Sequence, residues 1–223
     1  MTNGWVDMKN TDMMLIMGGN PAENHPCGFK WPIEAKRTRN AKMIVVDPRF
    51  TRTASVADLH CQIRAGSDIA FLGGVIRYAI ENNRIAKEYL VNYTNAAFIV
   101  KPGFQLPGDT DGVFSGFDAK TQSYDKSTWN YAVADDASKA MAAQKMAEVT
   151  AYPEPASPPP ALALPETLAY DLSLQNRNCV FQLLKKHYSR YTPEMVERIT
   201  GIPKEQFLKA ADLYTSIRKD GDM

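Results

Sequence analysis

Three short segments of the chain combine glycine, amide, carboxylate and guanidinium groups, and this mixture suits a ligand that contains phosphate. They are residues 18–23, 47–52 and 66–68. Gly18 and Gly19 let backbone amides approach a phosphate closely. Carboxylates can accept paired hydrogen bonds from a guanine edge or a ribose, and arginine presents a fork of donors to phosphate oxygens. Together the three segments indicate a nucleotide-containing ligand.

Some roles within these segments are open to two residues. Asn20 can hydrogen-bond in both senses. The phosphate donor is Arg49 or Arg52, and the acceptor for guanine or ribose is Asp47 or Asp68. A nicotinamide dinucleotide is a weaker alternative, because the fingerprint G-x-G-x-x-G is absent from the first segment.

Each segment follows a predicted strand. Residues 13–17 and 42–46 are continuous apolar runs, typical of strands buried on both faces of a parallel sheet, and a third short strand is expected around 59–63. A helix from about Gly28, with Pro32 confining its regular part or lying in its first turn, makes the first two strands a β-α-β unit. Ligands of such sheets bind outside the carboxyl ends of the strands, so we expect the three segments to meet at one edge.

The third segment also opens a long predicted helix. Ser67 is the expected N-cap, and Asp68 lies in the positive first turn. Gly73 and Gly74 weaken a helix, so we expect close packing against the sheet to compensate. The apolar stripe expected to face the core has helical spacing and consists of Ile69, Leu72, Val75, Ile76, Ala79 and Ile80.

Regular patterns become rare after a short helix expected at residues 86–93. Glycine and proline recur from 94 to 170, and residues 152–165 are rich in alanine and proline, which indicates a long irregular insertion. Three helical segments then follow, at residues 179–187, 192–201 and 203–217.

These elements predict an α/β fold: a doubly wound, mostly parallel, Rossmann-like sheet with a long irregular insertion and C-terminal helices. We expect a ligand-binding α/β domain at residues 1–93 and the insertion at residues 94–170. Residues 171–223 would form a helical segment that completes the same domain.

Composition argues against several other classes of function. The 26 Lys and Arg residues nearly cancel the 25 Asp and Glu residues, so there is no basic field of the kind that draws a protein onto nucleic acid. No apolar run approaches the roughly 20 residues that span a bilayer, and residues 1–10 lack the features of a signal peptide. Cys27, Cys61 and Cys179 lie far apart, so we expect small buried residues rather than ligands of zinc or an iron–sulfur cluster.

The three segments resemble the motifs of a known family, the molybdopterin oxidoreductases that carry bis-molybdopterin guanine dinucleotide. The stretches 18–26 (GGNPAENHP), 46–54 (VDPRFTRTA) and 64–68 (RAGSD) occur in that family's order and spacing. The resemblance narrows to the respiratory, typically periplasmic, formate dehydrogenases, because the opening MTNGW and the stretches YDKSTW and YTPE also look like theirs. It covers nearly the whole chain, and residues 131–168 are the clearest departure.

The resemblance implies that the first two segments contact one guanine dinucleotide arm of the cofactor and that the third closes on the same nucleotide. It implies no catalytic and no metal-binding residue here, because the family's selenocysteine or cysteine ligand, the histidine that follows it and the substrate-binding arginine have no counterpart in these 223 residues. We therefore expect the segment by itself not to oxidise formate. The implied cofactor-binding residues are Gly18, Gly19, Asn20, Glu23, His25, Asp47, Pro48, Arg49, Thr51, Gly66, Ser67 and Asp68.

The resemblance also implies a wider setting. The cofactor would carry molybdenum or tungsten, and an iron–sulfur cluster would lie elsewhere in the full subunit. The expected partners are the remainder of the catalytic subunit, an iron–sulfur electron-transfer subunit, in some members a membrane cytochrome b subunit, and formate, with no nucleic acid. The expected location is the periplasm. Two alternatives stay open: another molybdopterin oxidoreductase such as a nitrate reductase relative, and a nucleotide-binding fragment without catalysis.

Overall fold

The structure, a computed structural model, describes residues 4–129, 131–134 and 168–216. It divides into two compact units, the first formed by residues up to Arg84 together with those from Tyr188 onward, and the second by Ile85–His187. The first unit holds all three predicted binding segments. The expected division into 1–93, 94–170 and 171–223 stays a prediction.

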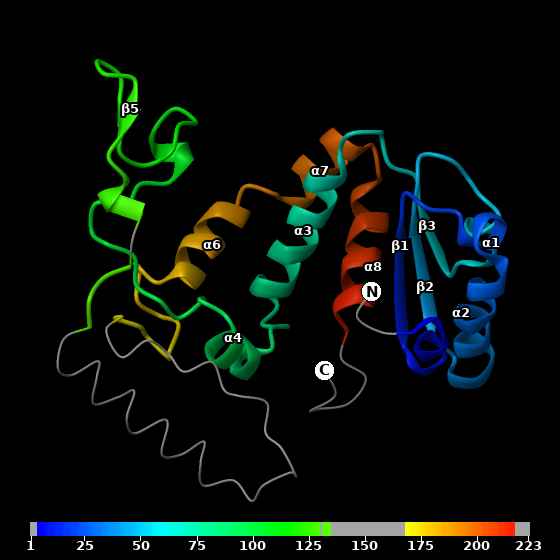
Figure 1. Ribbon diagram of the computed structural model, residues 1–223. Coiled ribbons are helices and arrows are strands. Elements are labelled where there is room, and N and C mark those ends of the chain that lie inside the picture. The colour runs from blue at the N-terminus through cyan, green and yellow to red at the C-terminus, as the bar shows by residue number, and fades with distance from the viewer. Residues whose placement is uncertain (1–3, 130, 135–167, 217–223) are drawn as a thin grey trace, which may run out of the picture. The chain divides into compact units, whose positions relative to one another are not determined.

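Three parallel strands in the order β1-β2-β3 form the sheet of the first unit (Figure 1). They are β1 (Met13–Met17), β2 (Lys42–Val46) and β3 (Leu59–Cys61). The last residue of each strand pairs with the last residue of its neighbour, so the three carboxyl ends are in register. The three predicted strands are confirmed, although β3 ends at residue 61 rather than 63.

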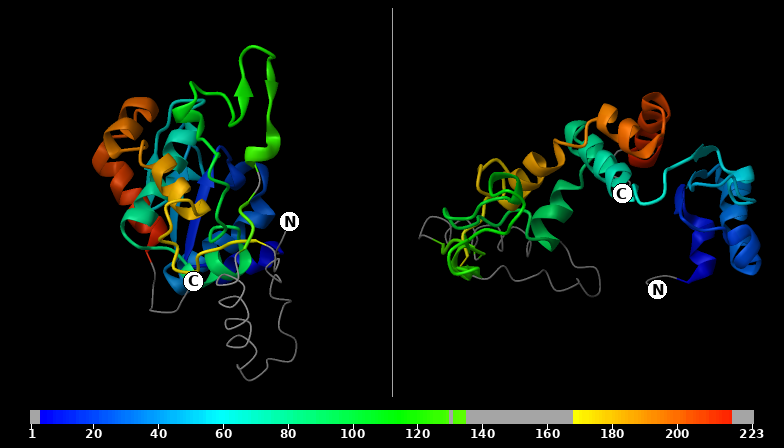
Figure 2. Two further views of the ribbon diagram at one scale, coloured as in Figure 1. Left: turned by 90° about the vertical axis from the view of Figure 1, so that its left-hand side faces the viewer. Right: turned by 90° about the horizontal axis from the view of Figure 1, so that it is seen from above.

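Helices cover both faces of this sheet (Figures 1 and 2). Because side chains alternate along a strand, β2 contributes to two separate apolar cores. Met43 and Val45 pack with Phe29 of helix α2 (Pro26–Arg39). Ile44 and Val46 belong to the opposite core. That core is completed by α3 (Asp68–Glu81), α7 (Pro193–Thr200) and α8 (Lys204–Thr215) through residues that include Phe71, Val75, Val196 and Phe207.

Helix α2 begins earlier than the predicted start near Gly28. Pro26 occupies its first turn, where a fixed φ and a missing N–H suit a helix. Pro32 therefore lies inside the helix, where it is buried, rather than in the first turn. Two short helices precede α2: η1 (Trp5–Asn10) and α1 (Pro21–Asn24).

The buried face of α3 differs from the predicted stripe. Phe71 and Val75 are buried, but Ile69 is 74% exposed, and Leu72 and Ile76 are also exposed. Only Val75 of the predicted stripe is buried. The prediction for this face was therefore largely wrong.

The cause is the glycine pair of α3. A Cβ on Gly73 would come within 2.8 Å of the Tyr191 ring, and a Cβ on Gly74 within 2.6 Å of Val196. The two glycines thus face the C-terminal part of the chain. This corrects the prediction that they pack against the sheet. Their close approach decides which side of α3 is covered.

The three predicted C-terminal helices are confirmed as α6 (Val180–Tyr188), α7 and α8. Thr192 caps α7 by accepting a hydrogen bond from the amide of Met195 at 3.1 Å. Gly201 ends the helix in the left-handed conformation, with φ of 78°.

The described residues of the second unit form short elements. They are α4 (Lys87–Tyr93), η3 (Pro107–Asp109), an antiparallel pair of β4 (Phe117–Asp118) and β5 (Ser123–Tyr124), η4 (Lys126–Trp129) and most of α6. The predicted alanine- and proline-rich stretch at 152–165 lies outside the described residues. Within the described part of the chain, no helix has both the length and the apolar character needed to cross a membrane.

Candidate nucleotide-binding site

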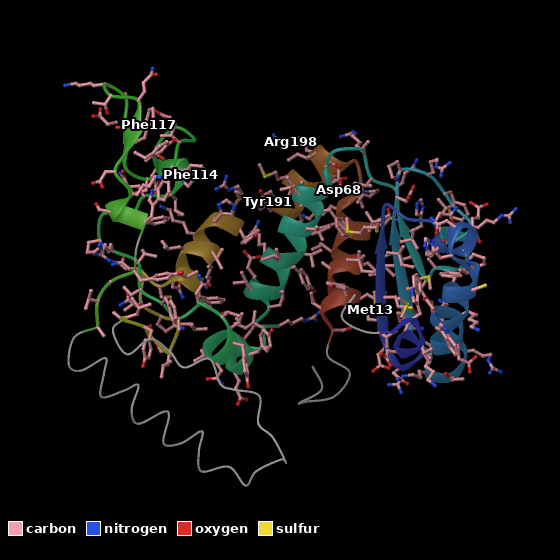
Figure 3. All side chains as sticks on the ribbon, viewed as in Figure 1. Met13, Asp68, Phe114, Phe117, Tyr191 and Arg198 are labelled. Carbon is pink, nitrogen blue, oxygen red and sulfur yellow. The ribbon has the colours of Figure 1, made fainter. Side chains whose placement is uncertain are left out.

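The predicted binding residues lie mainly in three loops that follow the three strands. We call residues 18–23, which run into α1, the first loop, residues 47–53 the second loop, and residues 62–68, which run into α3, the third loop. The parallel register directs all three toward the carboxyl edge of the sheet, the end opposite to Met13 at the start of β1 (Figure 3). In that view Asp68 marks the point where the third loop enters α3.

Side-chain hydrogen bonds join the first loop directly to the second. The Oδ1 atom of Asn20 accepts from the Thr53 amide at 3.3 Å and from the Thr53 hydroxyl at 2.9 Å. The same hydroxyl oxygen accepts from the Ala22 amide at 3.1 Å. The structure therefore brings two of the predicted segments together.

A second link between these loops lies at the surface. Arg52 and Glu23 form an ion pair with 3.0 Å between Nε and Oε1, and both side chains are exposed. The side-chain amide nitrogen of Asn20 donates to the Glu23 carboxylate. Exposed ion pairs stabilise a fold by only about 0–1 kcal/mol, so this pair orients side chains more than it holds the loops.

Asp47 is held at the start of the second loop, where its side chain is almost buried. Its Oδ1 atom accepts from the Arg49 amide at 2.8 Å. Its carbonyl accepts from Nε2 of His60 at 3.2 Å, which requires that this ring nitrogen carry a proton. The Gln62 side chain donates to the Pro48 carbonyl at 3.0 Å. Side chains of β3 and of the residue after it thus fix the backbone of the second loop.

Thr51 is nearly buried, and its hydroxyl oxygen accepts from the Ala54 amide at 3.2 Å. Ala54 is the first residue of the short helix η2 (Ala54–Val56), so this bond ties Thr51 to the start of that helix. The first role of Thr51 in this structure is therefore to shape the second loop. Arg49, by contrast, is exposed at the surface of that loop.

The third loop is bonded to α7 through Arg64, while Gln62 at its start is bonded to the second loop. The Arg64 amide donates to the Thr200 carbonyl at 2.9 Å, and Nη1 of Arg64 donates to the Arg198 carbonyl at 2.7 Å. Ser67 occupies the predicted N-cap position of α3, but its hydroxyl donates to the Arg64 carbonyl at 2.6 Å and makes no capping bond. Asp68 is exposed in the first turn of α3, as predicted.

His25 follows the first loop and stacks on an aromatic neighbour. Its ring lies 5.6 Å from the Trp5 ring, with an angle of 16° between the planes. Trp5 in turn packs on Gly28, whose position would bring a Cβ within 2.4 Å of the indole. This packing gives His25 a defined orientation at the side of the first loop.

The cysteines differ from each other. Cys61 and Cys179 are buried as expected, and burial raises the pKa of the Cys61 thiol to about 11. Cys27 is exposed, which corrects the expectation of a buried residue, because its place in the first turn of α2 faces outward. Among the residues that the structure describes, no three His, Cys, Asp or Glu side chains are grouped so that they could hold a metal ion.

Sequence reasoning missed Thr53, which is fully buried at the centre of the link between two loops. The repeat of threonine at 51 and 53 is a visible signal. Nothing local shows that residue 53 faces residue 20, because the contact depends on how the two strands pair.

Comparison with known sequences identifies the family. The family profile described as Molybdopterin oxidoreductase matches residues 1–189. The chain belongs to the molybdopterin oxidoreductase family. The match includes all three loops of the candidate site.

Within this family, the similarity to formate dehydrogenases is extensive. The chain is 46% identical over 216 residues to the nitrate-inducible formate dehydrogenase major subunit of Escherichia coli (strain K12), which covers 97% of this chain and 18% of that protein. It is 47% identical over 212 residues to the formate dehydrogenase major subunit of Haemophilus influenzae, covering 95% of this chain and 17% of that protein. The chain thus spans less than a fifth of these curated relatives.

A nitrate reductase is less similar to this chain. The protein from Shewanella frigidimarina is 34% identical over 88 residues, which covers 40% of this chain and 9% of that protein.

Proposed function

We propose that the chain is the part of a formate dehydrogenase catalytic subunit that binds one guanine dinucleotide arm of bis-molybdopterin guanine dinucleotide. The subunit would oxidise formate to carbon dioxide with the transfer of two electrons. The observation that carries the proposal is the pair of hydrogen-bonded loops at the carboxyl edge of the sheet. The matches to formate dehydrogenases along 95–97% of the chain favour formate over nitrate, for which the match covers 40%.

The donors and acceptors of these loops fit a guanine dinucleotide. Gly18 has φ of 60°, and a Cβ at this position would have no atom within 4 Å, so the backbone borders open space. A phosphate can approach such a backbone closely. The Asp47 carboxylate suits the paired N–H donors of a guanine edge, and the exposed Arg49 suits phosphate oxygens. Arg52 is already paired with Glu23, which favours Arg49 for that role.

The remaining cofactor-binding residues are assigned to the three loops in the same way. Gly19 and Asn20 would bind beside Gly18, and Glu23 and His25 would line the side of the first loop. Pro48 and Thr51 would shape the second loop around the base. Gly66, Ser67 and Asp68 would close on the same nucleotide from the third loop.

The bound cofactor would supply the two-electron chemistry at its molybdenum or tungsten, while this chain supplies binding and orientation. We further propose that the three strands belong to a doubly wound, Rossmann-like sheet within the whole subunit. The metal ligand, a selenocysteine or cysteine, and an iron–sulfur cluster would lie elsewhere in that subunit. The proposed partners are the rest of the subunit, an iron–sulfur electron-transfer subunit and, in a membrane-anchored complex, a cytochrome b subunit, with the complex in the periplasm.

The test uses the complete subunit in which we propose that this chain lies, purified with its partners. Guanosine monophosphate released by acid hydrolysis measures the cofactor, and formate-dependent reduction of a viologen dye measures activity. We expect both in the wild type, and no nitrate reduction. Asp47→Ala should lower the released nucleotide about tenfold or more, because a carboxylate hydrogen bond to a ligand contributes about 1.5–3 kcal/mol.

Asp118→Ala is the matched control, because Asp118 lies in β4 of the second unit and should leave cofactor content unchanged. Absence of guanine nucleotide from the wild type would overturn the binding assignment. Bound nucleotide without formate oxidation would favour a non-catalytic nucleotide-binding protein. Unchanged cofactor content in the Asp47 variant would refute the role of the second loop.

A further inference from the structure

Thr53 occupies a position that the cofactor proposal leaves without a role. Its side chain is 0% exposed, so it cannot contact a bound nucleotide from the surface. Its hydroxyl nevertheless bonds to two residues of the first loop, Asn20 and Ala22. A group of this kind acts on a site through its neighbours.

The direction of each hydrogen bond around Thr53 follows from neighbouring backbone amides, which can only donate. The Ala22 amide can only donate, so the Thr53 oxygen must accept there. The hydroxyl hydrogen donates to Asn20. The Thr53 amide also can only donate, and it points at the same atom of Asn20.

Two donors directed at one atom of Asn20 require that this atom be the carboxamide oxygen. The amide nitrogen must therefore face the opposite way, where it donates to Glu23 on the exposed side of the loop. A side-chain amide nitrogen carries two hydrogens, so one remains for a ligand at that side. The buried threonine thus decides which end of Asn20 a ligand meets.

We propose that Thr53 is a positioning residue of the guanine dinucleotide site and acts through Asn20. It holds the carboxamide with its nitrogen toward the ligand, and it fixes the spacing between the first and second loops. The inference rests on the proposed function, since it concerns the same ligand. Preorganised side chains bind more tightly because less freedom is lost when the ligand arrives.

Three variants of Thr53 separate the hydroxyl from the side-chain volume. Thr53→Val keeps the shape but removes both hydrogen bonds of the hydroxyl. Thr53→Ser keeps the hydroxyl. Thr53→Cys offers only a weak donor and acceptor, and it replaces the valine variant as the test if that variant does not fold.

The experiment follows loss of cofactor from the complete wild-type subunit and its variants. Each protein is incubated at raised temperature, and the guanosine monophosphate that stays bound is released by acid and counted over time. We expect Thr53→Val to lose cofactor about ten times faster than the wild type, Thr53→Cys to be intermediate, and Thr53→Ser to match the wild type.

A double-mutant cycle shows whether Thr53 acts through Asn20. Asn20→Ala should speed the loss about tenfold, and adding Thr53→Val to it should bring little further change. A merely structural role would instead make the two effects multiply. Multiplying effects, or a Thr53→Val variant that keeps its cofactor as long as the wild type, would overturn the proposal.

Failure of this inference is distinguishable from failure of the proposed function. If the wild type holds no guanine nucleotide, the function itself is wrong, and if Asp47→Ala has no effect on the bound nucleotide, the proposed binding by the second loop is wrong. If the wild type and Asp47→Ala behave as proposed while Thr53→Val retains cofactor normally, only the positioning role is wrong.

Discussion

The second and third loops leave neighbouring strands of one sheet, yet the fold holds them in different ways. The second loop is bonded to the first loop through Thr53 and Asn20, which lie 33 positions apart in the chain. The third loop is bonded to α7 through Arg64 and Arg198, which lie 134 positions apart. Similar sequence signals at strand ends therefore lead to one local assembly and one that depends on the C-terminal helices.

The pairing of the first and second loops therefore has a different structural basis from the placement of the third loop. The first and second loops follow the two strands of a single β-α-β unit, so the bonds between them do not involve the C-terminal helices. The third loop is placed by contacts of residues 64 and 200, together with the packing of α3 on α7. Changes to α7 should therefore reach the site only through the third loop.

The largest expected effect on stability comes from cutting the link between the third loop and α7. Arg64→Met removes the bonds from Nη1 to the carbonyls of Arg198 and Ile199. We expect the free energy of unfolding of the chain to fall by about 1–2 kcal/mol, measured by urea denaturation, because charge-assisted hydrogen bonds at a helix end are lost. Arg49→Met, on the second loop, is the control and should change stability by less than about 0.5 kcal/mol. Equal losses of unfolding free energy in the two variants would contradict the proposed difference between the second and third loops.

A smaller effect is expected at the glycines that open the first loop and precede α3. Gly18 and Gly66 have φ of 60° and 81°, and a Cβ at either would have no atom within 4 Å. Substitution by alanine should therefore cost only the backbone strain, about 1 kcal/mol at each position in urea denaturation.

Gly108 provides the matched control for these two substitutions. It also has open space around a Cβ, but its φ is not in the left-handed region. Gly108→Ala should leave the free energy of unfolding nearly unchanged. Unequal costs at Gly18 and Gly66 would mean that one loop rearranges to accept the side chain, and the two loops would then differ in rigidity as well as in contacts.

The smallest effect is expected at the opposite, amino edge of the sheet. Asp58 accepts from the Met43 amide at 2.8 Å and pairs with Lys36. Partial burial raises the pKa of Asp58, but the bonds from Lys36 and Met43 outweigh it, so the pKa lies below its ordinary value. A lowered folded-state pKa gives stability that is present above the unfolded value, about 3.9, and is lost as the pH falls through the folded value.

Asp58→Asn should therefore lower the free energy of unfolding by less than about 1 kcal/mol at pH 7. The difference from the wild type should shrink as the pH is lowered below about 4. Urea denaturation of both proteins at several pH values measures it. A difference that grows on acidification would show that the carboxylate does not stabilise the fold in its charged form.

The sequence alone predicted the elements that depend on neighbours along the chain. The apolar runs before residues 18 and 47 formed β1 and β2, and Thr192 and Gly201 bounded α7 as expected. Such signals succeed because strand burial, helix capping and left-handed turns are set by a few adjacent residues. The motifs in the three loops also resembled the family to which the chain belongs.

Only the tertiary structure decided which groups face each other. The buried side of α3 followed from Tyr191 and Val196, more than 100 positions after the glycines they meet. Thr53 contacts Asn20 because β1 and β2 pair in parallel. The Ser67 hydroxyl donates to the Arg64 carbonyl instead of capping α3. A residue type and its spacing limit what a side chain can bond, but the partner is chosen by packing between segments distant in the chain.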